Sequence, residues 1–156
     1  MPISIEIFHP AHYSQLRLRE PDRCSLEGLE NLDSMLIAYR ERGPCWTGFV
    51  EGRVLALGGV ALLWPGVGEA WMLTGELVPL YAREFHRTVK SLVEIAKTAL
   101  LLHRLQAAVR WDPHDREGNR MRLKWARALG LESEGLMPCY GANRDHWLRV
   151  AWVKET

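Results

Sequence analysis

The sequence is poor in three features that would assign a protein class at once: paired cysteines, charge of one sign and long apolar runs. Its three cysteines, Cys24, Cys45 and Cys139, are odd in number and widely spaced, which argues against a disulfide framework. We therefore expect buried, inert thiols in a reducing cytoplasm. The formal net charge is only +1, so neither nucleic acid nor a membrane surface is expected as a partner.

The longest apolar runs, 54–64 and 98–103, are too short to span a bilayer. The N-terminus lacks a basic region followed by a long apolar stretch, so a secretory signal is not expected. Apolar residues make up 47% of the chain and charged residues 25%, a balance typical of soluble globular proteins. With no repeat and no linker-like segment, residues 1–156 are predicted to form a single domain with its own core.

The first half of the chain predicts a strand, helices and a meander of three strands. Residues 3–8 alternate apolar and polar side chains, as a half-buried strand does, and Pro10 then opens a short helix. Residues 20–43 carry apolar side chains three and four apart, which indicates a helical segment that can break near Gly28 and ends at Gly43. Strands are predicted at 45–50, 53–64 and 69–75, joined by turns at 51–52 and 65–68. The pair Gly58-Gly59 predicts a bulge or a close backbone approach.

The second half predicts helix, strand, helix and strand. Residues 83–103 form the clearest amphipathic helix. Its predicted buried stripe is Phe85, Val89, Leu92, Ile95, Ala96, Ala99 and Leu100. A strand at 105–111, a helix at about 118–129 that ends at Gly130, and a last strand around 148–152 follow. The order predicts a mixed α/β sheet of α+β type, an antiparallel meander followed by a β-α-β unit, with helices on both faces. Helix 83–103 would be the crossover between parallel strands.

This order of elements, together with Asn119 and Gly130 in an N-x(10)-G spacing, resembles the GNAT superfamily of N-acetyltransferases. The likeness in element order covers nearly the whole chain, while motif-level likeness is confined to the last third. The resemblance implies acetyl-CoA as a possible cofactor. The pattern departs from the family at Leu131, where Phe is common, and at Ala126, where many members carry a proton-donating Tyr.

A narrower likeness points to T7-like phage internal virion or core proteins and related prophage proteins, which have a GNAT-like fold. It is carried by "MLTGEL" (72–77), by "AREFHR" (82–87) without glycine, and by Asn119-Arg120 followed by Trp125. The opening "HPAHYSQLRLREPDR" (9–23) is similar as well. This resemblance implies phage or host proteins as partners and a location in the host cytoplasm or the virion.

The resemblance places a diphosphate at the start of the helix that follows the fourth strand, where the family has glycines. The corresponding stretch 77–89 has none, and it places Glu84, Phe85 and His86 there instead. Backbone N–H groups at a helix start attract anions, and Arg83 and Arg87 would add to that attraction. An ordinary capped helix with solvent-facing arginines is the other interpretation.

Other candidate site residues follow from the same resemblance. The thioester and pantetheine arm pair with the fourth strand in the family, which by position implicates Leu73 and Thr74. Asn119 would contact the cofactor or cap its helix. Tyr140 is a remote substitute for the missing proton donor, and Glu69 and Glu76, with Glu27, are candidate general bases. Surface carboxylates and packing are the alternative interpretations of these residues. No His, Cys, Asp or Glu spacing predicts a metal site.

Three functions remain open from the sequence. The chain could be a phage or prophage accessory protein on a GNAT scaffold with a degenerate acetyl-CoA site. It could be an active acetyl-CoA-dependent N-acetyltransferase for an unknown amine, or a regulator that binds a CoA-like ligand without turnover. Six of the seven tryptophans are predicted to lie in the core, whereas Trp64, just before Pro65-Gly66, is a candidate anchor for a protein partner. Oligomers are possible.

Overall fold

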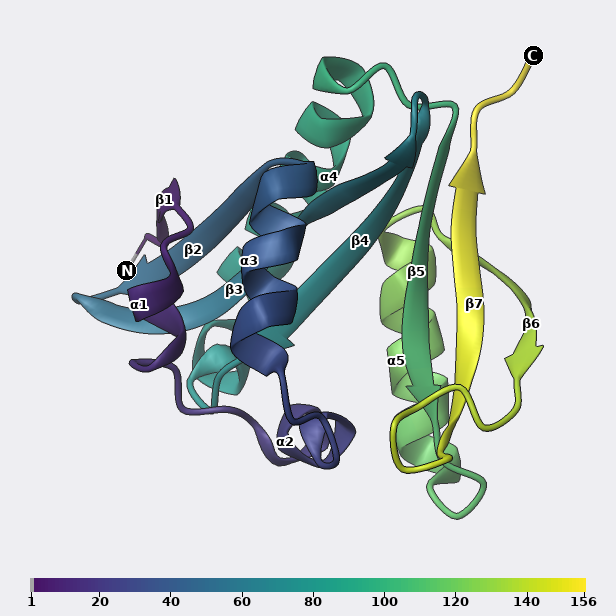
Figure 1. Cartoon of the computed structure of the whole chain (residues 1–156), viewed down its shortest axis with the longest axis horizontal. Helices are drawn as coiled ribbons and strands as arrows, with labels where there is room; N and C mark the ends of the chain where they lie inside the picture. Colours follow the sequence, from purple (N-terminus) through teal and green to yellow (C-terminus); the bar gives the residue numbers. More distant parts are fainter. Residues whose placement is uncertain (1) are drawn as a thin grey trace.

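Seven strands form one mixed sheet in the order β1-β2-β3-β4-β5-β7-β6 (Figure 1). The structure is a computed structural model that describes residues 2–156. The strands are β1 (Ser4–Ile7), β2 (Cys45–Val50), β3 (Arg53–Trp64), β4 (Val67–Thr74), β5 (Arg104–Trp111), β6 (Glu132–Met137) and β7 (His146–Val153). All neighbours are antiparallel except β4 and β5, which are parallel. The predicted meander, the crossover and the mixed sheet are confirmed.

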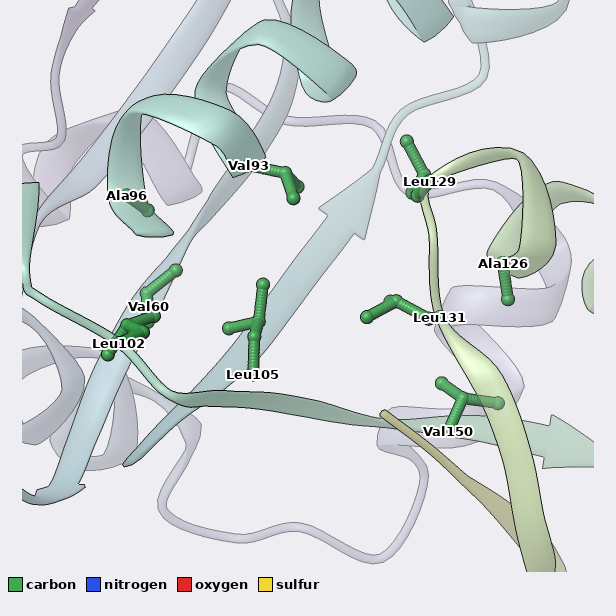
Figure 2. Packing of buried hydrophobic residues seen from close by; sticks show 9 residues of the cluster. All are labelled: Val60, Val93, Ala96, Leu102, Leu105, Ala126, Leu129, Leu131 and Val150. Carbon is green, nitrogen blue, oxygen red and sulfur yellow. The ribbon is translucent and has the colours of Figure 1, made fainter. Parts of the chain in front are cut away.

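Helices cover both faces of this sheet. They are α1 (Pro10–Tyr13), α2 (Glu20–Leu26), α3 (Leu32–Arg42), the 3-10 turn η1 (Val78–Tyr81), α4 (Ala82–Ala99) and α5 (Arg116–Ala128). On one face, Leu36 of α3 packs with Phe8 and Leu57. On the other, Val93 of α4 and Ala126 of α5 enclose a second core with strand residues such as Leu105 (Figure 2). Buried apolar surface on both sides stabilises the layers.

Two expectations about the elements are wrong. The order predicted from the sequence has six strands and omits β6, whose residues are almost all exposed and lack the alternation that marks a half-buried strand. Helix α4 ends at Ala99 rather than 103, because Leu101 has a left-handed backbone with φ of +50°. In its predicted stripe, Ile95 is 55% exposed, whereas Val93 is buried.

The edge strand β1 and the cysteines also differ from expectation. Strand β1 exists, but Ile7 is 78% exposed, so its apolar side chains are not half-buried. Cys45 is buried, and burial raises the pKa of its thiol to about 11, as an inert thiol requires. Cys24 is only partly buried and Cys139 is exposed. The tryptophans predicted as core are each partly buried, and Trp64 is 62% exposed, as predicted.

The Gly58-Gly59 pair marks a close backbone approach rather than a bulge. A Cβ on Gly59 would lie 2.5 Å from the Pro44 carbonyl oxygen and 2.9 Å from the Cys45 Cα. The irregularities in strand register lie elsewhere, next to Phe49 and Trp64. Glycine is therefore required at position 59 by contact with the β2 backbone, which cannot move without disturbing the sheet.

We expect Gly59→Ala to lower the free energy of unfolding by about 1–3 kcal/mol, the cost of overpacking a close-packed interior. Gly48→Ala is the matched control in the same pair of strands, since its Cβ would lie 3.5 Å from the nearest Ile3 atom, an ordinary contact. Urea unfolding of both variants checks this. Equal stability of the two would contradict the assigned contact.

Candidate active site

The candidate site is the gap that opens between the parallel strands β4 and β5. Their pairing covers only three residue pairs and ends at Glu69 and Gln106. Beyond this point the carboxyl ends of the two strands diverge, with α5 behind the opening (Figure 1). In open α/β sheets, ligands bind at the carboxyl ends of strands where neighbouring connections leave to different sides. The three-pair contact thus lets the two strands separate in the middle of the sheet.

One edge of β4 borders this gap. The Gly75 N–H donates to the Leu55 carbonyl oxygen of β3 at 2.9 Å. Because successive residues of a strand direct their backbone groups to opposite edges, Thr74, Met72 and Ala70 direct theirs toward the gap. Pairing with β5 has already ended at Glu69. An extended ligand could therefore pair with this edge at Met72.

The far end of this edge is occupied by the chain itself. Leu18 forms an antiparallel bridge with Gly75, and the Arg19 N–H donates to the Thr74 carbonyl oxygen at 2.9 Å. The carboxylate of Asp22 in α2 accepts the Thr74 N–H at 2.6 Å and the Thr74 hydroxyl as well. Thr74, a candidate for cofactor binding, therefore has its backbone donor satisfied by an internal carboxylate.

Side chains of two helices fill the gap on the other face. The rings of Phe85 in α4 and Trp125 in α5 stack with centroids 6.1 Å apart and planes 13° apart. The Trp125 indole N–H donates to Nδ1 of His86 at 3.1 Å. Met72 of β4 packs in the same cluster. These contacts join the beginning of α4 to the middle of α5 across the space behind the β4 edge.

The beginning of α4 carries no anion cradle of the glycine-rich kind. Helix α4 follows η1 directly, and its N-cap, Tyr81, makes no side-chain cap hydrogen bond. Arg83 and Arg87 are exposed, and neither forms an ion pair within residues 2–156. Glu84 lies in the first turn, where its charge competes with an anion for the positive end of the helix. Positive charge is present here, but no backbone recess accompanies it.

The face of the gap toward α3 brings together two of the candidate catalytic residues. Glu69 of β4 accepts a hydrogen bond from Arg149 Nη1 of β7 at 2.9 Å. The Arg149 guanidinium lies over the ring of Tyr140, 5.8 Å from its centroid. The ring of Tyr39 in α3 stacks on the ring of Trp71, with the two centroids 5.2 Å apart. Burial raises the pKa of Tyr39, and the nearby Glu69 and Tyr140 raise it further.

Other predicted site residues lie apart from this cluster. Glu76 is exposed, and its Oε1 lies 3.7 Å from Nη1 of Arg17. Leu73 is a core residue under α3, and Glu27 uses its carbonyl oxygen to accept the Asn143 side-chain N–H at 2.7 Å. Ala126 is 3% exposed and belongs to the core between α4, α5 and the sheet. The position equivalent to the family's proton donor thus carries a core side chain.

Asn119 does not cap its helix, and that alternative is wrong. Helix α5 begins at Arg116, and Asp115 is its N-cap. The buried Asn119 amide instead fixes the preceding loop, donating to the Asp112 carbonyl oxygen at 2.6 Å and accepting the Asp112 N–H at 3.0 Å. It also accepts from Arg122 Nη2 at 2.7 Å. These bonds leave its oxygen and nitrogen engaged within β5 and α5.

Sequence reasoning missed three contributors to the gap: Asp22, Arg149 and the contact between Trp125 and His86. Asp22 is 52 residues from its partner Thr74, and Arg149 is 80 from Glu69. No local spacing signals such pairs. Among residues 2–156, no group of three or more His, Cys, Asp and Glu side chains is arranged to hold a metal ion. In the same part of the chain, no helix has the length and apolarity that crossing a membrane requires.

Comparisons with known proteins define the fold. No protein-family model and no curated protein sequence matches the chain. Several solved acetyltransferases are similar over nearly their whole length. A candidate phosphinothricin N-acetyltransferase has a TM-score of 0.73 at 14% identity, with 99% of each chain covered. A GNAT-family acetyltransferase from Streptococcus pneumoniae has a TM-score of 0.66 at 14% identity, with 98% of this chain and 99% of that chain covered. A Bacillus subtilis acetyltransferase solved with CoA has a TM-score of 0.66 at 14% identity, with 99% of each chain covered. The chain therefore has the GNAT acetyltransferase fold.

The contact between Asp22 and Thr74 predicts a pH dependence of stability. Burial raises the pKa of Asp22, and the hydrogen bonds from Thr74 oppose this rise only in part. The native carboxyl therefore binds a proton more tightly than the unfolded one. Between the two pKa values, stability falls as pH rises, since the native state holds more protons there.

We expect Asp22→Asn, which keeps an amide oxygen for the Thr74 N–H but has no charge to desolvate, to remove this loss. Relative to wild type, the variant should gain stability as pH rises above about 4, the ordinary pKa of an aspartate. Urea unfolding across this range measures it, and Glu30→Gln, at an exposed loop position, is the control. A constant difference between wild type and Asp22→Asn at every pH would refute the assignment.

Proposed function

We propose that this chain is a non-catalytic phage or prophage accessory protein on a GNAT acetyltransferase fold, with its acetyl-CoA groove closed by its own side chains. The observation that carries the proposal is the contact of Trp125 with Phe85 and His86, which fills the space behind the β4 edge. In the family that this fold resembles, the cofactor's pantetheine arm lies along this edge. A stacked aromatic pair excludes such an arm from that space.

The residues present do not fit acetyl-CoA at its diphosphate end either. Cradling a diphosphate requires backbone N–H groups that the anion can approach closely, for which glycines leave room. Here Glu84 and His86 carry side chains at the start of α4, and Glu84 adds negative charge in its first turn. Arg83 and Arg87 offer exposed positive charge only. We therefore derive no chemical step through this cofactor.

Among the described residues, the candidate proton-transfer positions taken from the sequence resemblance are not arranged as a catalytic pair. A general base must lie within hydrogen-bond reach of the proton it removes, with a free acceptor atom. Oε1 of the Glu69 carboxylate accepts from Arg149, which fixes this side chain against β7, and Tyr140 is 51% exposed beside that guanidinium. Ala126 offers no acid in the core. The polar cluster on this face is built as a stabilising network between β4 and β7.

The phage or prophage part of the proposal comes from the sequence resemblance at 72–77, 82–87 and 119–125. It assigns a protein of the phage or its host as the partner, and the host cytoplasm or the virion as the location. Co-purification of the tagged chain with phage structural proteins from infected or induced cells tests it. A gene neighbourhood without phage genes, together with no such co-purification, would reject this part.

An active N-acetyltransferase is the second candidate, and one observation favours it. The backbone groups of Met72 face the gap beyond the last β4–β5 pair, an edge that an acyl-CoA amide could use. On this candidate, the acceptor would be an amine at the face of Glu69 and Tyr140. Movement of Trp125 away from Phe85 would have to precede cofactor binding.

A thermal-shift titration with acetyl-CoA separates the two candidates. A ligand present at a hundred times its dissociation constant adds about 2.7 kcal/mol to the free energy of unfolding, a rise of several degrees in the melting temperature. We expect no shift for the wild type at millimolar acetyl-CoA, because the groove is filled. A saturable shift would reject the closed groove, and thiol release with an amine would establish the enzyme.

Opening the groove should restore binding. We expect the triple variant Glu84→Gly, His86→Gly and Trp125→Leu to show an acetyl-CoA-dependent rise in melting temperature that the wild type lacks. Glycine costs about 1 kcal/mol at each helix position, so the unliganded variant should be less stable. Lys124→Ala, an exposed change in the same helix, is the control. A folded triple variant without binding would show that these three side chains are not what closes the groove.

A further inference from the structure

One hydrogen bond behind the β4 edge depends on the protonation state of a histidine. The Trp125 indole N–H donates to Nδ1 of His86 at 3.1 Å, across 39 residues of chain. An indole nitrogen can only donate, so Nδ1 must offer a lone pair to it. The imidazole is therefore neutral, with its proton on Nε2, whenever this contact is made.

Protonation of His86 removes this bond and leaves no substitute for it. Both ring nitrogens of an imidazolium carry hydrogen, so no rotation of the ring offers the indole an acceptor. The imidazole also lies at the N–H edge of Trp125, the positive part of an aromatic ring, where a cation is repelled rather than attracted as it is over the ring face. Losing a hydrogen bond of this kind shifts an equilibrium by up to about tenfold.

The stack on Phe85 does not hold Trp125 in place by itself. The two ring centroids are 6.1 Å apart. This lies toward the upper end of the range of about 4.5–7 Å over which aromatic pairs attract. A stack sets the plane of the indole, whereas the hydrogen bond sets the direction of its N–H edge. Breaking the bond to His86 therefore leaves the indole free to turn about its side-chain torsions.

The surroundings of His86 let a proton reach it and do not oppose the release. His86 and Trp125 are both partly exposed. Among residues 2–156, no carboxylate forms an ion pair with His86. Glu84 lies two residues earlier, about 200° around the helix. The strands packed against this cluster contribute apolar side chains to it. The titratable and charged side chains on the adjoining turns of η1, α4 and α5 are Tyr81, Arg83, Glu84, Arg87, Lys90, Arg122, Lys124 and Arg127.

We propose that the contact of His86 with Trp125 is an acid-released latch on the groove: the neutral imidazole holds the indole behind the β4 edge, and the imidazolium frees it. The latch rests on the proposed function, since it presupposes a groove that Trp125 closes. Its release uncovers the backbone groups of Met72, and the imidazolium adds positive charge at the beginning of α4, where Glu84 competes with an anion. Acid therefore reduces the misfit with acetyl-CoA at both the arm and the diphosphate.

Nuclear magnetic resonance of the Trp125 indole N–H tests the latch without any ligand. Its signal is assigned with Trp125→Phe and followed from about pH 8 to about pH 5.5, within the range in which histidine usually changes charge. After correction for the intrinsic pH dependence of exchange, we expect hydrogen exchange of this N–H with water to become up to about tenfold faster in acid. The change should have the same midpoint as the signals of the His86 ring.

Two variants identify the group that titrates. His86→Asn keeps an acceptor oxygen at the position of Nδ1 but does not change charge, so its indole signal should show no transition. His114→Gln is the matched control, because His114 is exposed in the loop before α5 and its loss should leave the transition in place. A wild-type signal without a transition would overturn the latch, and so would the same transition in His86→Asn.

A thermal-shift titration with acetyl-CoA at both ends of this pH range tests what the latch controls. We expect the melting temperature of the wild type to rise with millimolar acetyl-CoA at about pH 5.5 and not at about pH 8. His86→Asn should show no rise at either pH, which controls for changes in the charge of the ligand. Release of the indole without binding in acid would overturn the gating of the groove. Binding at the higher pH with the indole still protected would instead reject the closed groove itself.

Discussion

The short pairing between β4 and β5 is the constraint on which the rest of the structure depends. Parallel strands need a long crossover, and α4 supplies it, so the two strands meet only at their beginnings. Their divergence opens the sheet in its middle and leaves backbone groups of β4 unpaired with β5. A sheet built in this way must either admit a ligand or fill the opening with its own side chains.

Side chains of this chain lie on both faces of the opening and at its end. Stacking of Phe85 on Trp125 closes the helical face, and burying a large side chain stabilises a fold by about 1.5–3 kcal/mol. Asp22 takes up the backbone donor of Thr74, and the Glu69–Arg149 ion pair joins β4 to β7 over the opposite face. Each of these contacts contributes to the stability of the sheet around the opening.

The sequence by itself determined the order of elements, the mixed sheet, the crossover helix, the exposure of Trp64 and the lack of glycine before α4, because periodicity and turn residues act locally. It missed β6, whose exposed residues carry no alternation. It also offered Asn119 as the N-cap of α5, whereas the helix begins at Arg116 and Asp115 is its N-cap. Only the tertiary structure decided how the gap is filled. The partners Asp22 and Thr74, Glu69 and Arg149, and His86 and Trp125 are 39 to 80 residues apart, and packing alone brings them together.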